Sequence, residues 1–414
     1  MSSRSPVSHF LPEPKTLAIV GCPFSGGQAK LGVDRGPIHL VQAGLPEQLS
    51  ELGWKVLFDG HHQFEEIDAA SDPPIGKLKN PRLVSRVCEA IAKVVGEHAK
   101  KGQLPLTLGG DHSLAMGTIS GTFEQYPDAC VVWVDAHGDI NTAETTDSGN
   151  IHGMPVSFLL GLGSKIPEFS WVKPLLKPER LVYIGLRDVD AGEKKILKEN
   201  GIRAFSMHEV DKYGIGRVVE MALDHVNPKR DRPIHLSFDV DALDPSVAPS
   251  TGTPVRGGLT FREGHYICEA IYETGCLVAL DIMEVNPSLA DEAEVKQTVA
   301  VGCSLARSAL GETLLGSPFA QTRASTTLLA YPGRSHIQEK DKKLVLAPPS
   351  HSTLEKLGST LVQKEGQESF LAPQNYLTSR YPASSFSPFA INTTFISTTS
   401  HPTMFNGVLT PDIV

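Results

Sequence analysis

The sequence has few cysteines and lacks any run of about 18 apolar residues. These two absences argue against a protein held together by disulfides and against a transmembrane protein. The six cysteines lie scattered in apolar segments without a C-x-x-C spacing, so they indicate reduced packing residues in a cytosolic protein rather than disulfides. Without a long apolar run the chain has no predicted transmembrane helix. Because the N-terminus also lacks the apolar core of a secretion signal, we expect a cytoplasmic location.

Positively charged residues are fewer than negatively charged ones. The chain carries 38 lysines and arginines against 47 aspartates and glutamates, which gives a net charge of −9. This balance argues against a nucleic acid or an anionic membrane as the main partner. With 414 residues, of which 40% are hydrophobic, the chain can bury a large core.

From residue 16 to about residue 315, short apolar runs alternate with amphipathic segments. Continuous apolar strands alternating with helices predict a three-layer α/β/α domain with a mostly parallel sheet of about eight strands. Strands are predicted at 17–22, 55–59, 104–108, 130–135, 181–186, 203–205, 234–239 and 277–282, and helices at 37–52, 82–101, 113–124, 190–200, 208–226, 262–275 and 291–310. Residues 1–15 predict a flexible arm, and the Ser-, Thr- and Pro-rich residues 316–414 predict a disordered extension.

A row of possible metal ligands follows the apolar run 131–134. Asp135, His137 and Asp139 are spaced two residues apart, and in extended backbone such residues point to one face. Taken singly, each of them is better explained as a salt-bridged or helix-capping residue. As a row at the end of a buried strand they indicate a metal site, because buried carboxylates are nearly always paired or metal-bound.

Two further predicted strand ends carry the same residue types. Asp239 and Asp241 end one strand, and His112 lies just past another. Four aspartates and two histidines are too many ligands for one zinc ion. A set of oxygen and imidazole ligands without cysteine suits a harder ion such as Mn²⁺, and six ligands with bridging carboxylates suit a pair of ions.

Six motifs in order along the chain resemble those of arginase, a family of the ureohydrolase group. They are GGDHS (109–113), DAHGDIN (135–141), SGNIHG (148–153), GLRDVDAGE (185–193), SFDVDALDP (237–245) and DIMEVNP (281–287). The likeness covers residues 17–315 and implies the arginase-like fold. It also implies hydrolysis of L-arginine to L-ornithine and urea by a hydroxide that bridges two Mn²⁺ ions.

The resemblance also implies how the metal ligands are shared. One ion would be held by His112, Asp135, Asp139 and Asp239, and the other by His137, Asp135, Asp239 and Asp241, with Asp135 and Asp239 bridging. Four carboxylates would then offset the charge of two divalent ions.

The same resemblance assigns roles around the substrate. Glu284 would accept bidentate hydrogen bonds from the guanidinium group, with Thr253 as a nearby hydroxyl contact; the alternative for Glu284 is an ion pair at a strand end. Asp139 would pass a proton to the leaving amine. His152, which has no strand-end partner in the sequence pattern, would carry protons between the site and solvent; a lone loop histidine is otherwise more often structural.

Substrate choice depends on groups that meet the α-carboxylate and the α-ammonium of arginine. His137 is placed in the substrate pocket as well as among the ligands, Asn141, Thr146, Ser148 and Asn150 would donate to the carboxylate, and Asp190 and Glu193 would accept from the ammonium. The alternative for the last two is capping of the helix at 190–200. Three other functions stay open: an agmatinase-like guanidino hydrolase, a non-catalytic binding protein of this fold, and a zinc deacylase.

The sequence departs from the family pattern at Gly138, where threonine is usual, and at Ala191, where proline is usual. Glycine beside two ligands is expected to loosen the backbone and weaken metal affinity. The resemblance implies a homo-oligomer, a trimer or hexamer, and Arg262 and Glu263 match residues at the subunit interface of the family.

Overall fold

The structure is a computed structural model that describes residues 9–11 and 15–313. The predicted disordered extension 316–414 and most of the predicted arm 1–15 lie outside the described residues. Residues 9–11 lie against the domain: Leu11 is buried, and the His9 amide donates to the Gly275 carbonyl at 2.7 Å. No helix in the described part of the chain is long and apolar enough to cross a membrane.

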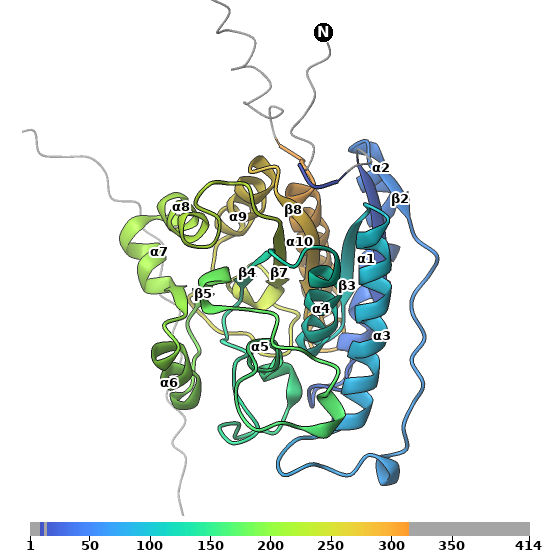
Figure 1. Ribbon diagram of the computed structural model, residues 1–414. Coiled ribbons are helices and arrows are strands. Elements are labelled where there is room, and N and C mark those ends of the chain that lie inside the picture. The colour runs from blue at the N-terminus through green and yellow to red at the C-terminus, as the bar shows by residue number, and fades with distance from the viewer. Residues whose placement is uncertain (1–8, 12–14, 314–414) are drawn as a thin grey trace, which may run out of the picture. The chain divides into compact units, whose positions relative to one another are not determined.

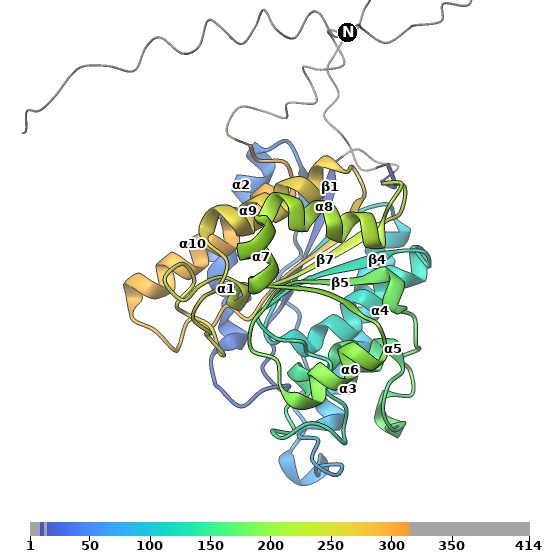
Figure 2. The ribbon, with the colours of Figure 1, turned by 90° about the vertical axis from the view of Figure 1, so that its left-hand side faces the viewer.

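Eight strands form one sheet in the order β2-β1-β3-β8-β7-β4-β5-β6, and every neighbouring pair is parallel (Figures 1 and 2). This confirms the predicted parallel α/β sheet. The strands are β1 Thr16–Cys22, β2 Lys55–Leu57, β3 Leu104–Gly109, β4 Cys130–Val134, β5 Leu181–Leu186, β6 Arg203–Ser206, β7 Ile234–Asp239 and β8 Leu277–Met283. Every residue of the six inner strands is buried, which explains their continuous apolar sequences.

Helices cover both faces of this sheet. Helices α1, α2 and α7–α10 share a core with one face, while α3, α4, α5 and α6 pack on the other. The helices are α1 Gly36–Gln42, α2 Leu45–Glu51, α3 Pro81–Lys100, α4 Ala115–Gln125, α5 Pro155–Leu160, α6 Ala191–Glu199, α7 Met207–Tyr213, α8 Ile215–Val226, α9 Phe261–Glu273 and α10 Glu292–Ala309. The six cysteines are buried and unpaired in this core, as expected for packing residues.

The helix predictions were wrong in three places: two predicted helices are each broken into two, and one helix was not predicted. The segments 37–52 and 208–226 are each two helices, because Gly44 (φ 82°) and Gly214 (φ 73°) adopt a left-handed or otherwise positive-φ backbone that interrupts a helix. Helix α5 was not predicted, since its six residues are too short to show a helical period.

Candidate metal centre

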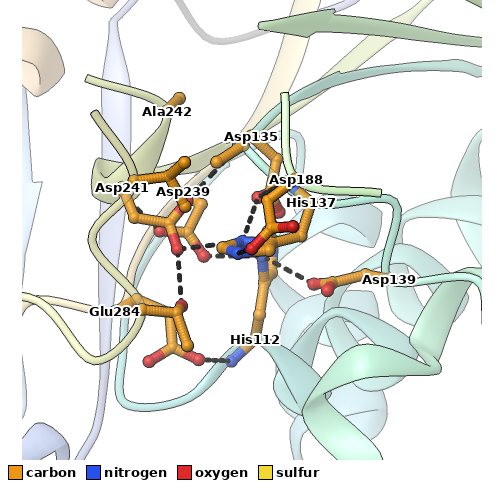
Figure 3. A network of polar contacts seen from close by, with 12 residues as sticks. His112, Asp135, His137, Asp139, Asp188, Asp239, Asp241, Ala242 and Glu284 are labelled. Atoms are coloured by element: carbon orange, nitrogen blue, oxygen red, sulfur yellow. Dashed lines mark hydrogen bonds and ion pairs between the residues drawn. The ribbon is translucent and has the colours of Figure 1, made fainter. Parts of the chain in front are cut away.

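The carboxyl ends of four adjacent strands, β3, β8, β7 and β4, meet at the centre of one edge of the sheet. His112 lies three residues after β3, Asp135 directly follows β4, and Asp239 is the last residue of β7. Because the strands are parallel, these side chains reach the same place from distant parts of the sequence (Figure 3).

One cluster of carboxylates surrounds a ring nitrogen of His112. The distances from His112 Nδ1 are 3.2 Å to Asp135 Oδ2, 3.3 Å to Asp139 Oδ2 and 3.2 Å to Asp239 Oδ2. The histidine is fully buried and the three carboxylates are nearly so. A ring nitrogen carries at most one hydrogen, so it cannot satisfy three carboxylates at once. A cation bound among these atoms would interact favourably with all three carboxylates.

A second cluster adjoins the first and shares Asp135 with it. His137 Nδ1 lies 3.3 Å from Asp135 Oδ1 and 3.2 Å from Asp241 Oδ2. Asp135 therefore turns one oxygen toward each histidine, and the described residues contain two groups of possible ligands around it. The second proposed bridge is less evident, because Asp239 Oδ1 accepts a hydrogen bond from the Asp241 amide at 2.8 Å.

Burial and neighbouring charges shift the pKa values of the carboxylates in the two clusters. Burial and the Asp241 carboxylate raise the pKa of Asp239 well above its usual range, and burial and Asp135 raise the pKa of Asp139 to about 6. Burial also disfavours the charge of Asp135, but hydrogen bonds with His112 and His137 outweigh it and lower its pKa. Nitrogen and oxygen donors crowded in this way, without sulfur, fit a hard divalent ion.

The predicted reason for the convergence of Asp135, His137 and Asp139 was wrong. Strand β4 ends at Val134, and Asp139 has a left-handed backbone with φ 48°, so the three residues do not lie on extended chain. They belong to a folded loop in which the His137 amide donates to Asp135 Oδ1 at 2.7 Å. The loop, rather than the period of a strand, brings the side chains together.

Two hydrogen bonds hold the backbone at and after Gly138. The Tyr183 hydroxyl donates to the Gly138 carbonyl at 2.8 Å, and the neighbouring Ile140 amide donates to Glu193 Oε1 at 3.3 Å. The loosening expected from a glycine is therefore restrained in this loop. The effect of Gly138 on metal affinity stays a prediction.

His152 has a strand-end partner that the sequence pattern did not reveal. Its Nδ1 lies 3.0 Å from Glu284 Oε1, and the same oxygen accepts from the His112 amide at 2.9 Å. Burial lowers the basicity of His152, but the hydrogen bond and charge of Glu284 outweigh it and raise the pKa to about 9. Glu284 itself has a left-handed backbone, with φ 64°, directly after β8. Thus the alternative noted for Glu284, an ion pair at a strand end, is present in the structure.

A pocket opens beside the two clusters. Its lining residues are His137, Asp139, Asn141, His152, Gly153, Asp188, Asp190, Glu193, Asp239, Asp241 and Thr253. Carboxylates thus outnumber all other side-chain types in its walls. Asp188, which was not singled out from the sequence, is one of them, and its Oδ2 lies 3.9 Å from His137 Nε2. Its place in the GLRDVDAGE motif was the signal that could have found it.

Asp190 and Glu193 both cap a helix and line the pocket. They form a capping box at the start of α6, with the Glu193 amide donating to Asp190 Oδ1 at 2.9 Å. Asn141 Nδ2 donates to Asp190 Oδ2 at 2.6 Å. Burial and the Asp139 carboxylate raise the pKa of Glu193 to about 7. Capping is therefore present, and it leaves both carboxylates facing the pocket.

The other predicted substrate contacts lie apart or have different partners. Thr253 donates to Asp241 Oδ2 at 2.8 Å and so contacts a possible ligand. Thr146, Ser148 and Asn150 are not among the pocket-lining residues. The Thr146 hydroxyl accepts from the Gly149 amide at 3.0 Å, and that of Ser148 accepts from the Asn150 amide at 3.2 Å.

The fold and the site together define an α/β protein with two adjoining candidate metal sites at the carboxyl edge of a parallel sheet. Residues 15–311 match the model of the arginase family. An arginase of Glaciozyma antarctica is 68% identical over 314 residues, covering 74% of this chain and 91% of that protein, and an arginase of Neurospora crassa is 58% identical over 325 residues, covering 75% and 90%. This chain belongs to the arginase family.

Solved structures agree with this membership. The crystal structure of the cold-adapted arginase from the psychrophilic yeast Glaciozyma antarctica has a TM-score of 0.62 and 62% identity, and the alignment covers 75% of this chain and 99% of that one. The arginase of Bacillus caldovelox has a TM-score of 0.68 and 40% identity, covering 72% and 99%. The family likeness noted from the six motifs is thereby confirmed.

Proposed function

We propose that the protein is an arginase, a hydrolase that cleaves a guanidino C–N bond of L-arginine to give L-ornithine and urea with two Mn²⁺ ions per subunit. The observation that carries this proposal is the sharing of Asp135 between the clusters around His112 and His137. The relatives that carry the name arginase, at 68% and 58% identity, support it further.

The residues that would hold the ions are those of the two clusters. His112 and Asp139 would serve one ion, His137 and Asp241 the other, and Asp135 both, with Asp239 beside them. When bound, a pair of such ions lowers the pKa of a shared water molecule enough for it to act as a nucleophile near neutral pH.

The charge of the pocket suits a substrate with more than one positive group. Four aspartates of the clusters would offset two divalent ions, which leaves Asp188, Asp190 and Glu193 as further acidic groups in or beside the walls. A guanidinium and an α-ammonium group would offset part of this remaining negative charge. Asn141 has a second amide hydrogen for the α-carboxylate, since one is donated to Asp190.

Protons would move through the chain's own side chains. With a pKa of about 9, His152 holds a proton at neutral pH in its contact with Glu284. Its side chain is 20% exposed, so it can exchange that proton with solvent. Asp139 would take up a proton from the attacking water and pass it to the leaving amine. Release of Glu284 Oε1 from His152 would make this oxygen available to the guanidinium.

The test is urea and ornithine release by metal-free protein before and after addition of Mn²⁺, with metal counted by elemental analysis. We expect activity only after loading, two ions per chain, and arginine turned over at least 100-fold faster than agmatine, which lacks the α-carboxylate. Equal turnover of the two would favour the agmatinase-like alternative. One zinc per chain and no urea would contradict the proposal.

The assignments of location and assembly stay predictions. A cytoplasmic location and a homo-oligomer, a trimer or hexamer, are tested by cell fractionation and by light scattering of the purified full chain. Glu263 has a local role as well, because its carboxylate accepts from the Thr260 amide at 2.8 Å in the capping box of α9.

A further inference from the structure

A buried network of polar side chains lies behind His112, on the side away from the carboxylate clusters. His112 Nε2 lies 2.9 Å from the Ser237 hydroxyl, which donates to Asp281 Oδ2 at 3.2 Å. Asp281 and Ser237 are 1% and 0% exposed. Neither a core packing role nor the ligand set accounts for a carboxylate at this depth.

Three polar side chains converge on one oxygen of Asp281. Besides Ser237, the Thr118 hydroxyl donates to Oδ2 at 2.7 Å, and His235 Nε2 lies 2.8 Å from it. The other oxygen, Oδ1, has no hydrogen-bond partner among the described residues. Oδ2 is therefore the anchor of the network, and the acceptor that receives the Ser237 hydrogen.

The direction of the Ser237 hydrogen determines which nitrogen of His112 is protonated. A neutral imidazole carries one hydrogen, and a metal ligand must offer a nitrogen without one. While Asp281 accepts the Ser237 hydrogen, the Ser237 oxygen can only accept from His112 Nε2–H. When an ion is bound, Nδ1 would then face that ion without a hydrogen. If Ser237 turned its hydrogen to Nε2 instead, the ring hydrogen would move to Nδ1 and block it.

We propose that Asp281 is a positioning residue, which acts through Ser237 to present His112 Nδ1 as a metal ligand. The inference rests on the proposed metal centre. Stacking of the His112 ring on Trp133, at 4.1 Å between centroids, fixes the plane of the ring but not the location of its hydrogen. The hydrogen is therefore set by the Ser237–Asp281 contact, which agrees with the general rule that partners of metal-bound histidines orient and tune them.

The experiment measures Mn²⁺ bound per chain against free Mn²⁺ for the full chain and for Asp281→Asn, which has the shape of aspartate but accepts hydrogen bonds more weakly. We expect one of the two ions to bind 10- to 100-fold more weakly, the range for such partner residues. The variant would then hold one ion per chain where the unaltered protein holds two. Unchanged affinity, or equal weakening of both ions, would overturn the proposal.

Two controls separate positioning from a general loss of structure. Thr122→Val removes the hydroxyl 2.9 Å from His235 Nδ1, and this hydroxyl contacts neither Ser237 nor His112, so metal affinity should change less than 3-fold. Because Asp281 acts through Ser237, Asp281→Asn should have an effect below 3-fold in a Ser237→Ala background. An undiminished effect there would refute the path through Ser237.

Failure of this inference is distinguishable from failure of the proposed function. If the unaltered protein binds no pair of ions, the metal centre itself is wrong. If it binds two and Asp281→Asn binds them with the same affinity, only the role of Asp281 is wrong. Urea unfolding of the metal-free variants reports any loss of stability separately, and a purely structural Asp281 would lower that stability while leaving the difference between the ions unchanged.

Discussion

Replacement of Arg187 by methionine should destabilise the loops that carry Asp241, although Arg187 is not among the predicted metal ligands or substrate contacts. Its guanidinium group donates to a series of backbone carbonyls in two segments. The distances are 2.6 Å to the Asp241 oxygen, 2.9 Å to that of Ala242, 3.1 Å to that of Leu243 and 2.7 Å to that of Val255. One side chain thus fastens the turn after β7 to the loop at residue 255.

The expected loss follows from these four acceptors. A hydrogen bond to a charged donor contributes about 1.5–3 kcal/mol, and an acceptor left buried without a partner costs about 1–3 kcal/mol. Arg187 is only partly buried, so water can replace some of its bonds. For Arg187→Met, which keeps the length of the side chain, we therefore expect the free energy of unfolding to fall by about 2–4 kcal/mol.

The assay is urea unfolding of the metal-free protein, followed by Mn²⁺ titration. Arg187→Lys is the matched control, because it keeps the charge but a single ammonium group cannot reach both segments. We expect it to recover less than half of the loss. Since the turn carries Asp241, the methionine variant should also bind Mn²⁺ more weakly. A loss in Arg187→Met below about 0.5 kcal/mol would refute the reasoning, because surface substitutions alone give changes of that size.

Three further predictions concern the proton carrier, an acidic turn and a glycine. His152→Ala should lower urea release by about 10²–10⁴-fold while elemental analysis still finds both ions; lost metal would show that His152 holds the centre together. Hydrogen bonds from Ser246 lower the pKa of Asp244 to about 2, so this carboxylate stabilises the fold above its unfolded pKa near 4 and loses that contribution as the pH falls toward 2. The stability difference between the unaltered chain and Asp244→Asn should accordingly shrink from pH 5 to pH 2.5 in urea unfolding, and a constant difference would contradict this sign. Gly110→Ala should prevent folding or cost several kcal/mol, because an added Cβ would lie 1.7 Å from the Phe24 carbonyl, whereas Gly153→Ala, with no atom within 4 Å, should fold normally by circular dichroism.

The architecture was predictable because its signals are local. Inner strands such as β4 and β7 are buried on both faces and are therefore apolar at nearly every position, which distinguishes them from helices in the sequence itself. Parallel strands have their carboxyl ends at the same edge, so the pattern of strand ends was enough to group Asp135 with Asp239. Two of the three errors in the helices fell at Gly44 and Gly214, where a positive φ ends one helix before the next begins.

The contacts that shape the site could not be predicted, because they join residues far apart in the chain. Glu284 contacts the His112 amide, 172 residues away in the sequence, and His152, 132 residues away. No local sequence pattern predicts either contact. The left-handed backbone of Asp139 likewise depends on the loop around it, since its residue type permits several conformations. The role of Arg187 could not be predicted either, because its four backbone acceptors lie in segments distant from it in the sequence.

The sequence by itself determined the layers of the fold, the parallel direction of the strands and the identity of the histidines and aspartates, since burial and residue chemistry are properties of short segments. The strand order β3-β8-β7-β4, the sharing of Asp135 and the anchoring of His112 through Ser237 to Asp281 were decided only by the tertiary structure. The physical reason is that a side chain's partners are chosen when separate segments pack, and the energy of that packing depends on the whole chain at once.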